Sequence, residues 1–368
     1  MSSELARERR ERVLNLYREH GWDALLVYGN AWRCDYLRYV TDFPILEGHG
    51  YALLEATGRL RLFLEVPLEA ERAGVEANDC EVVCQPDILA TLAAQLGVYR
   101  GRRLAGAPLQ LMPRGAAEAA GPAFEDASEA FDLLLMHKTE REIDAVRRAA
   151  RIADAGYQVF MRAARPGRAE YEVVAEVEAF FRAQGCPDNF MILGSGGREV
   201  YGMHPPGERR LRAGDLVTTE LTPCVDGYYA QICRTLVIGP PSPEQAAAFD
   251  LYVQSMEAGL AAVRPGATAA EIARRENDVF RAHGFGEYTT SKYTRVRGHG
   301  LGLYVDSRPA LLEDVDTPLA EGMTIIVHPN TYHPDAGYIV LGDAAIVRPG
   351  GSDVLTATPR TLFSVPAS

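Results

Sequence analysis

Side chains suited to proton transfer or metal binding recur through the second half of this 368-residue chain. They are one glutamate, Glu220, and three histidines, His204, His299 and His328. Two prolines after His204 stiffen its backbone, and glycines on both sides of His299 allow a close approach. An imidazole near its reference pKa can take up and release a proton near neutral pH. These four are the predicted catalytic residues.

A predicted β-hairpin positions the glutamate. Strands over 216–222 and 228–238 are joined through Asp226-Gly227, a favoured two-residue turn. In that register position 220 lies opposite position 233, and side chains alternate between two faces. One face carries polar side chains together with a cysteine: Thr218, Glu220, Thr222, Tyr229, Gln231 and Cys233. Because an inward carboxylate and amide are costly to bury without partners, we predict that this face belongs to a site.

An internal repeat relates the two halves of this region. Residues 181–185 return, with one substitution, as residues 280–284. A glycine followed by a six-residue run ends at Glu220 in the first copy and at His328 in the second. Two copies indicate a pseudo-twofold domain with a site at the seam. We therefore expect Glu220 and His328 to face each other across one cleft.

Helix signals in each copy support this repeat. A capping box at Thr139-Glu142 opens a predicted helix over 140–164, and a second helix over 169–184 stops at a glycine. The second copy has similar start signals at 242–245 and 268–271. Each copy is thus predicted to contain two helices followed by strands.

The first third of the chain is predicted to be a separate, smaller α/β domain. It opens with an amphipathic helix over 3–19, and short strands then alternate with helices. Residues 30–48 are predicted to form one long polar and aromatic loop. The predicted domains are residues 1–134 and residues 135–368, since a chain of 368 residues is long for one domain.

Composition narrows the class of protein. The net charge is −12 and no basic run stands out, which argues against nucleic acid or an anionic membrane as a partner. The six cysteines lack paired metal-ligand spacing. We find neither an apolar signal core nor an apolar run long enough to span a bilayer, so we expect a cytoplasmic protein.

Four motifs carry a resemblance to a known superfamily. They are Gly214-Asp215-Leu216-Val217, Gly227-Tyr228 with Arg234-Thr235, Gly298-His299-Gly300-Leu301-Gly302, and Leu319 with Gly322-Met323. Residues 138–347 resemble the catalytic domain of methionine aminopeptidase, prolidase, aminopeptidase P and creatinase. The resemblance implies an α+β pita-bread domain with internal pseudo-twofold symmetry. Residues 1–134 are similar in layout to the N-terminal domain of creatinase and prolidase.

The same resemblance directs attention to the metal positions. Metallopeptidases of this superfamily hold two ions with two aspartates, a histidine and two glutamates. The matching positions here carry Glu220, Gln231, His299, His328 and Gly342, and Asp306 matches a further histidine of the family. A ligand that bridges two dications must be an anion, because the ions repel each other strongly. Gln231 and Gly342 cannot serve, so we expect no dinuclear site. The resemblance to the creatinase-like branch, which lacks the metals, implies that no cofactor is needed.

The first hypothesis is therefore a metal-independent, creatinase-like hydrolase. It would split a C–N bond in a small amide, amidine or guanidino compound. The resemblance makes His204 the proton-transfer residue, and Glu220 would stabilise the cation that forms. His299 and His328 would polarise the carbonyl group or hold a carboxylate.

Two alternatives stay open. In one, Glu220, His299 and His328 hold a single Fe, Mn or Zn ion, with Gln231 as a weak fourth ligand. That enzyme would be an Xaa-Pro peptidase-like hydrolase, a lyase or an oxygenase. In the other, the domain is a catalytically inert module that binds a small molecule or a protein.

Further residues are predicted to contact a small-molecule substrate: Tyr229, Gln231, Cys233, Arg308 and Arg33. Arg308 and Asp306 follow the glycine loop, where they could bind a carboxylate or pair with each other. We also expect a homodimer in which the N-terminal domain of one chain closes the cleft of the other, because excluding water strengthens charge interactions.

Overall fold

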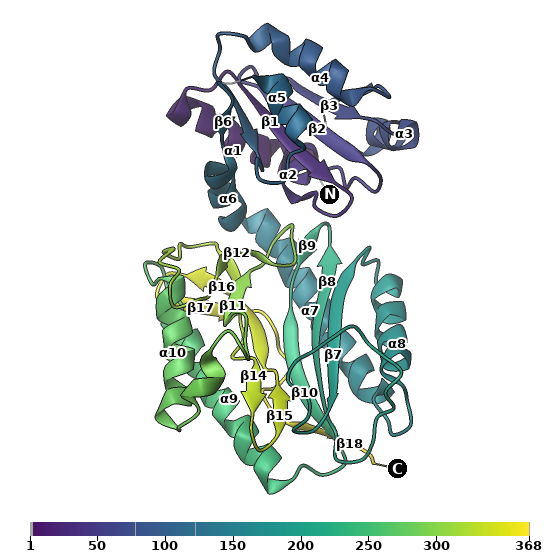
Figure 1. Cartoon of the computed structure of the whole chain (residues 1–368), viewed down its shortest axis with the longest axis vertical. Helices are drawn as coiled ribbons and strands as arrows, with labels where there is room; N and C mark the ends of the chain where they lie inside the picture. The colour runs from purple at the N-terminus through teal and green to yellow at the C-terminus, as the bar shows by residue number, and fades with distance from the viewer. Residues whose placement is uncertain (1–2, 78, 122, 368) are drawn as a thin grey trace. The chain divides into compact units, whose positions relative to one another are not determined.

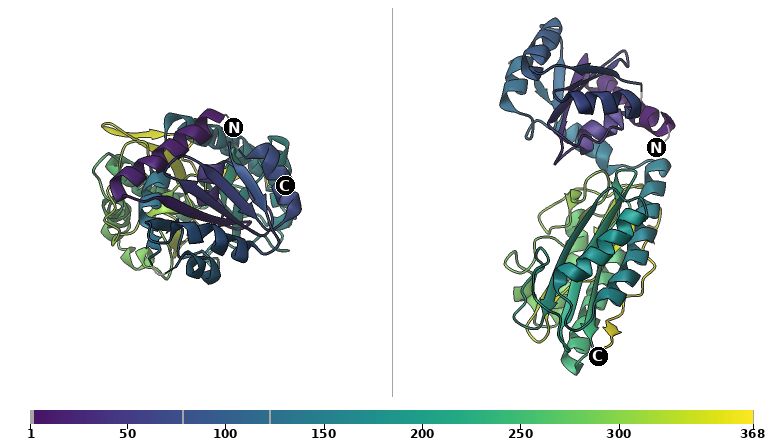
Figure 2. Two further views of the ribbon diagram at one scale, coloured as in Figure 1. Left: turned by 90° about the horizontal axis from the view of Figure 1, so that it is seen from above. Right: turned by 90° about the vertical axis from the view of Figure 1, so that its right-hand side faces the viewer.

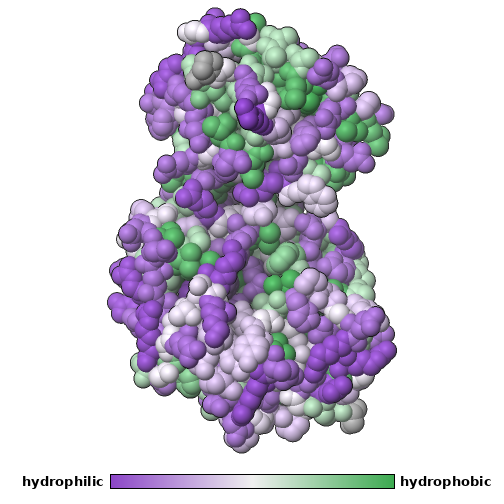
Figure 3. Space-filling model, viewed as in Figure 1, coloured by the Kyte–Doolittle hydropathy of each residue, from purple (hydrophilic) through white to green (hydrophobic). Residues whose placement is uncertain are grey.

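The computed structural model describes residues 3–77, 79–121 and 123–367. Contacts divide the chain into two compact units, Met1–Leu135 and Met136–Ser368 (Figure 1). On the face drawn in Figure 3, hydrophilic residues are spread over each unit, with smaller hydrophobic patches between them. None of the helices in the described ranges combines the length and apolar character that a membrane crossing requires.

The first unit is built on a six-stranded sheet with the order β4-β3-β2-β1-β5-β6. Its strands are β1 (Ala24–Asn30), β2 (His49–Glu55), β3 (Leu60–Leu64), β4 (Glu81–Cys84), β5 (Leu104–Ala107) and β6 (Glu125–Asp126). Its helices are α1 (Ser3–His20), α2 (Asp35–Thr41), α3 (Pro67–Glu76), α4 (Ile88–Leu96), α5 (Arg114–Ala120) and α6 (Ser128–Met136), with a 3-10 turn at Gly97–Tyr99. This matches the predicted alternation of short strands and helices.

Helix α2 corrects one prediction, because it lies in the segment 30–48 that was expected to be a loop. The helix buries Tyr36, Leu37 and Val40, which lie on one side of a helical turn. It ends at Asp42, whose φ of 60° is left-handed. Two turns are too short for the apolar spacing to stand out from the polar residues around them.

The second unit is built on a ten-stranded sheet whose main path is β12-β11-β13-β16-β10-β8-β7. Its helices are α7 (Glu140–Ala163), α8 (Glu170–Ala183), α9 (Pro243–Ala262) and α10 (Ala269–Ala282), with a 3-10 turn at Gly286–Thr289. The strands of the first copy are β7 (Asn189–Gly196), β8 (Leu216–Val225), β9 (Tyr228–Tyr229) and β10 (Ile232–Ile238). The later strands are β11 (Gly298–Gly300), β12 (Ser307–Ala310), β13 (Thr324–Val327), β14 (Thr331–His333), β15 (Gly337–Ile339), β16 (Gly342–Arg348), β17 (Gly351–Val354) and β18 (Phe363–Val365).

The predicted repeat is visible in this order of elements. Each copy contributes two helices and then strands, and β10 and β16 pair where the copies meet. Thr139 and Ser242 both form full capping boxes, at the starts of α7 and α9. Helices α7 and α8 lie over one face of the sheet (Figure 2).

The hairpin register is also confirmed. Glu220 pairs with Cys233 across β8 and β10. The turn residues Asp226 and Gly227 have φ values of 51° and 88°, which is the left-handed pair that such a turn requires. Val217, Leu221 and Ile232 face the helix side and join one hydrophobic cluster.

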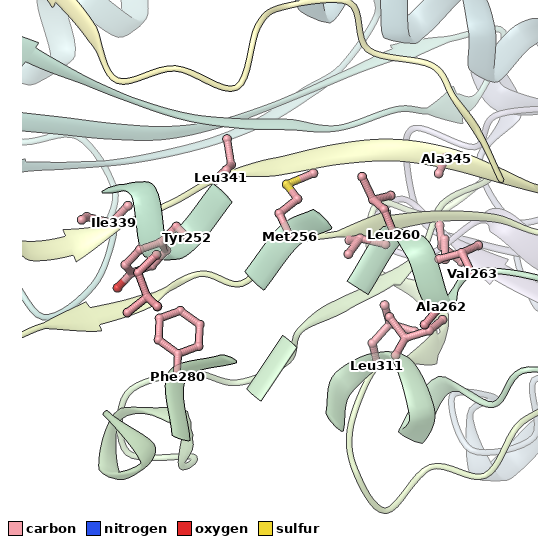
Figure 4. Packing of buried hydrophobic residues seen from close by; sticks show 14 of the residues in the cluster. Tyr252, Met256, Leu260, Ala262, Val263, Phe280, Leu311, Ile339, Leu341 and Ala345 are labelled. Atoms are coloured by element: carbon pink, nitrogen blue, oxygen red, sulfur yellow. The ribbon is translucent and has the colours of Figure 1, made fainter. Parts of the chain in front are cut away.

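A second hydrophobic cluster holds the later helices on the sheet. Tyr252 and Met256 of α9 and Phe280 of α10 pack with Ile339 and Leu341 from the strand side (Figure 4). The Tyr252 hydroxyl also donates to the Thr331 carbonyl oxygen at 2.8 Å. The two helix pairs thus fix the strands that carry the polar residues.

Candidate active site

A cavity of about 440 Å³ opens within the second unit. Four of the predicted site residues line it: Glu220, Gln231, His299 and His328. Glu220 and His328, the residues that the repeat makes equivalent, therefore share one cavity as expected. Tyrosines supply much of the remaining wall: Tyr201, Tyr293, Tyr304 and Tyr338.

Strand pairing brings the two cavity histidines together. His299 lies in β11, which pairs with β13, and His328 follows β13 directly. Their ring centroids are 5.5 Å apart. Gly298 has a φ of 145°, and a Cβ there would stand 2.1 Å from the Ile326 carbonyl oxygen. The glycine thus admits the neighbouring strand, and this close packing holds His299 in place.

Glu220 is buried beside two polar neighbours. Asn330 Nδ2 donates to Glu220 Oε1 at 2.8 Å, and Cys233 Sγ lies 3.7 Å from the same oxygen. Burial raises the pKa of Glu220 to about 7, although both neighbours act to lower it. The carboxylate is therefore one that a bound cation would stabilise strongly.

His299 is held in one neutral tautomer. Its Nδ1 donates to the Gly300 carbonyl oxygen at 2.9 Å, so its Nε2 is left as an acceptor. Burial lowers the pKa of His299, and the charge of Asp306 only partly offsets this. A neutral imidazole with one nitrogen fixed by a carbonyl group is the form that binds a metal ion.

Two buried polar atoms at the cavity lack partners among the described residues. They are His328 Nδ1 and Gln231 Oε1. Burial, with a contribution from His299, also lowers the pKa of His328 well below its usual range. Both residues line the cavity, but these two atoms are buried in its wall.

Gly342 adjoins the same wall but offers no side chain. A Cβ there would stand 2.8 Å from His328 Cβ and 2.9 Å from Cys233 Sγ. These two side chains thus fill the space next to position 342. In the described residues, no three His, Cys, Asp or Glu side chains stand ready at metal-ligand spacing.

The structure puts the other predicted site residues elsewhere. His204 is half-exposed, with Nδ1 2.8 Å from the Pro205 carbonyl oxygen, and it is not among the described residues that line the cavity. The Tyr229 hydroxyl donates to Asp188 at 2.5 Å, away from the cavity lining. Cys233 is buried and does not line the cavity, although its Sγ lies 3.7 Å from Glu220 Oε1.

The two predicted arginines also lie outside the cavity lining. Arg308 is exposed on β12. Arg33 belongs to the other unit, where its Nε donates to Asp35 at 2.7 Å.

Asn330 and Arg295 are among the cavity residues that were not predicted from the sequence. Asn330 carries the amide that contacts Glu220, and no periodicity marks it because it follows the end of a strand. Arg295 lines the cavity and pairs with Asp306 at 2.7 Å, whereas Asp306 had been considered as a partner of Arg308. Arg295 lies in a segment without regular structure, so only its charge could have singled it out.

Known proteins resemble this chain over most of its length. It is 30% identical over 314 residues to a probable dipeptidase PepE of Mycobacterium tuberculosis, which covers 84% of this chain and 82% of the relative. It is 29% identical over 242 residues to an Xaa-Pro dipeptidase of Pyrococcus furiosus, covering 65% and 68%. The solved Xaa-Pro dipeptidase of Bacillus anthracis superposes with a TM-score of 0.84 at 28% identity, covering 98% of this chain and all of that one. These matches confirm the predicted pita-bread fold.

The comparisons also correct the predicted function. The similar proteins are described as Xaa-Pro dipeptidases and dipeptidases, so the placement in a creatinase-like branch is wrong. The prediction of metal-independent hydrolysis of a small amide, amidine or guanidino compound is wrong for the same reason. The expected absence of metal came from the resemblance to creatinase, and the alternative with a single ion agrees better with the similar proteins.

The family comparison covers the region of the repeat. Residues 144–349 match metallopeptidase family M24, which is more than half of the chain. The expectation that no cofactor is needed is therefore contradicted. The repeat, the cavity that it encloses and this match lead to one conclusion: the chain belongs to metallopeptidase family M24.

Proposed function

We propose that this protein is a metal-dependent hydrolase that cleaves Xaa-Pro dipeptides. The observation that carries the proposal is the convergence of Glu220, His299 and His328 on one cavity. The similarity to Xaa-Pro dipeptidases over most of the chain supports the substrate class. A cavity of about 440 Å³ suits a small substrate better than a folded protein.

The donor set fits one metal ion. Glu220 offers a carboxylate, and His299 and His328 offer imidazoles whose lowered pKa keeps them neutral. Two histidines and one carboxylate suit Fe, Mn or Zn and leave positions open. Gln231 Oε1 would add a weak neutral ligand. The three main donors would draw together around the ion, since they do not stand at ligand spacing without it.

The same residues do not suit a second ion. Gln231 is neutral, and Gly342 has no side chain to share between two dications. Cys233 and His328 also occupy the space into which a larger residue at 342 would extend. The proposal is therefore a mononuclear site.

Each part of the cavity has a role in this reaction. A bound divalent ion supplies Lewis-acid polarisation of the scissile carbonyl group. Asn330 holds Glu220 in position through its amide. The tyrosine wall excludes water and offers apolar surface to a proline ring.

Metal analysis and activity test the proposal together. Protein purified without a histidine tag should carry about one Fe, Mn or Zn ion per chain and hydrolyse Ala-Pro. His299→Ala should lose both the ion and the activity. His333→Ala is the matched control, because His333 is equally buried in the same unit but does not line the cavity.

Three outcomes would contradict this function. About two ions per chain would show that the mononuclear site is wrong. Full activity after the ion is removed would exclude metal dependence. Tight binding of dipeptides without turnover would favour an inert binding module.

The homodimer stays a prediction, which sedimentation of the full chain would test.

A further inference from the structure

A buried arginine holds both ends of the segment 328–330, which joins β13 to β14. The Arg297 carbonyl oxygen accepts a hydrogen bond from the backbone N–H of His328 at 2.9 Å. Its guanidinium group reaches the other end, where Nη1 donates to the Asn330 carbonyl oxygen at 3.1 Å. His328 and Asn330 both line the cavity, whereas Arg297 is not among the described residues that line it. Two cavity residues therefore depend on one side chain behind them.

Other contacts fix Arg297 in turn. Its Nε donates to Asn277 Oδ1 of α10 at 2.5 Å, and Asn277 Nδ2 donates to Glu313 Oε1 at 2.6 Å. The backbone N–H of Arg297 donates to the Leu311 carbonyl oxygen at 2.9 Å. Its guanidinium group lies over the Phe280 ring, 5.3 Å from the centroid. The planar guanidinium group thus links α10 rigidly to the segment 328–330.

A buried guanidinium group is costly, and a buried acid on α10 offsets part of this cost. Burial lowers the pKa of Arg297, and Glu276 is the first of the groups that act against this effect. Burial also raises the pKa of Glu276 well above its usual range, while the charge of Arg297 acts to lower it. Apolar residues can often replace such a pair without loss of stability. The core alone therefore does not require these two residues, which favours a role for them in the adjoining cavity.

We propose that Arg297 is a positioning residue that holds His328 and Asn330 in place for the proposed metal ion. This inference rests on the proposed function and adds to it a residue behind the cavity. The hydrogen bonds continue from Arg297 through Asn330, whose Nδ2 donates to Glu220 Oε1 at 2.8 Å. Arg297 thus acts on a proposed ligand from each copy of the repeat. Groups that orient metal ligands change metal affinity although they do not contact the ion.

The main test removes the arginine without leaving a buried acid beside an empty position. The double variant Arg297→Met with Glu276→Met should keep the wild-type denaturant midpoint, because both charged groups are replaced by adaptable apolar side chains. Its affinity for Mn²⁺, measured by calorimetry on metal-free protein, should nevertheless fall at least about tenfold. The kcat for Ala-Pro should fall with it.

Arg297→Lys provides a second variant, which decides the question if the double variant does not fold. It keeps the positive charge beside Glu276, but one ammonium group cannot reproduce the fork that serves both Asn277 and Asn330. We expect an affinity for Mn²⁺ between that of wild type and that of the double variant. Wild-type affinity in this variant would mean that only the charge matters and would overturn the positioning role.

Ser255→Ala is the matched control. Ser255 is also buried, and its hydroxyl donates to the Glu276 carbonyl oxygen at 3.0 Å. Among the described hydrogen bonds, none links its side chain to the segment 328–330. This variant should lose stability and keep its affinity for Mn²⁺. An equal loss of affinity in Ser255→Ala and the double variant would overturn the proposal, since any disturbance between α9 and α10 would then suffice.

Hydrogen exchange separates this inference from the proposed function. Peptides that cover residues 324–333 are followed by mass spectrometry in metal-free wild-type protein and in the double variant. Exchange at 328–331 should become at least about tenfold faster, as for the loss of one hydrogen bond to a charged group. Peptides from α9 and α10 should keep their wild-type protection.

The possible outcomes of this measurement are distinct. If no Mn²⁺ binds and no Xaa-Pro dipeptide is hydrolysed, the proposed function fails. Faster exchange confined to 328–331 would still show that Arg297 positions this segment. Wild-type exchange at 328–331 in the double variant, or faster exchange throughout the unit, would overturn the inference.

Discussion

The two copies of the repeat give the cavity different side chains. The first copy comprises α7, α8 and the β8–β10 hairpin, and the second comprises α9, α10, β11 and β13. The first contributes Glu220 and Gln231, which are oxygen donors. The second contributes His299 and His328, together with the amide of Asn330. Both copies have capped helices and a strand that follows a glycine. The repeat thus preserves the scaffold, while the type of donor side chain differs between the two copies.

The contrast also shows how the halves depend on each other. Asn330 of the second copy donates to Glu220 of the first. Buried Arg234 of the first copy pairs with Asp343 of the second at 2.6 Å. Neither half is a complete site, and we expect changes in either half to affect the same function.

The largest effect is expected when a proposed metal ligand is removed from either copy. Glu220→Gln and His328→Ala should each lower kcat/KM for Ala-Pro by at least about a hundredfold, because both are proposed ligands of one ion. Metal content measured by mass spectrometry should fall in both variants. Loss in one variant alone would show that a single copy holds the ion.

The pKa shifts in the two copies have opposite signs, and this gives a second test. Burial raises the pKa of Glu220 to about 7, so the metal-free folded protein keeps a proton that the unfolded chain has already released. The contribution of Glu220 to stability is therefore greatest at low pH and is lost as pH rises through about 7. The pKa of His299 and that of His328 are lowered, so their contributions are lost as pH falls below the unfolded value of about 6.5.

Glu220→Gln isolates the first of these effects. Denaturant unfolding of metal-free protein should show the variant gaining stability over wild type between about pH 5 and about pH 8. A stability difference that does not change with pH would mean that Glu220 has an ordinary pKa.

The contact between the copies can be weakened without removing a donor. Asn330→Ala removes the hydrogen bond that helps to lower the pKa of Glu220, so this pKa should rise further. We expect a fall of about tenfold in kcat/KM, with an activity profile displaced to higher pH. An unchanged profile would show that the amide does not govern the carboxylate.

The smallest expected effect concerns the shared scaffold. Thr139→Ala and Ser242→Ala remove equivalent caps from α7 and α9. Each should lower the free energy of unfolding by about 1 kcal/mol without changing KM. A change in KM would mean that helix starts and cavity are more tightly coupled than the contacts indicate.

Much of the scaffold could be predicted because its signals are local. The capping residues, the Asp226-Gly227 turn and the alternation along β8 gave the helices, the hairpin and its register. The repeat correctly paired Glu220 with His328. Helix α2 was missed because two turns provide too little periodicity.

The site was less predictable because it depends on contacts between distant segments. Nothing near Asn330 or Arg295 in the chain marks their roles. Metal dependence was misjudged for a different reason: Gln231 and Gly342 argue against a shared pair of ions, but they say nothing against a single ion.

The division of the cavity residues between two successive segments has a practical consequence. The short connection at 239–241 lies between β10 and α9, after Glu220 and before both cavity histidines. A chain cut there would yield two fragments that are each inactive, and activity would return only when they reassociate. The enzyme could thus serve as a split reporter whose signal records the meeting of any two proteins fused to its fragments.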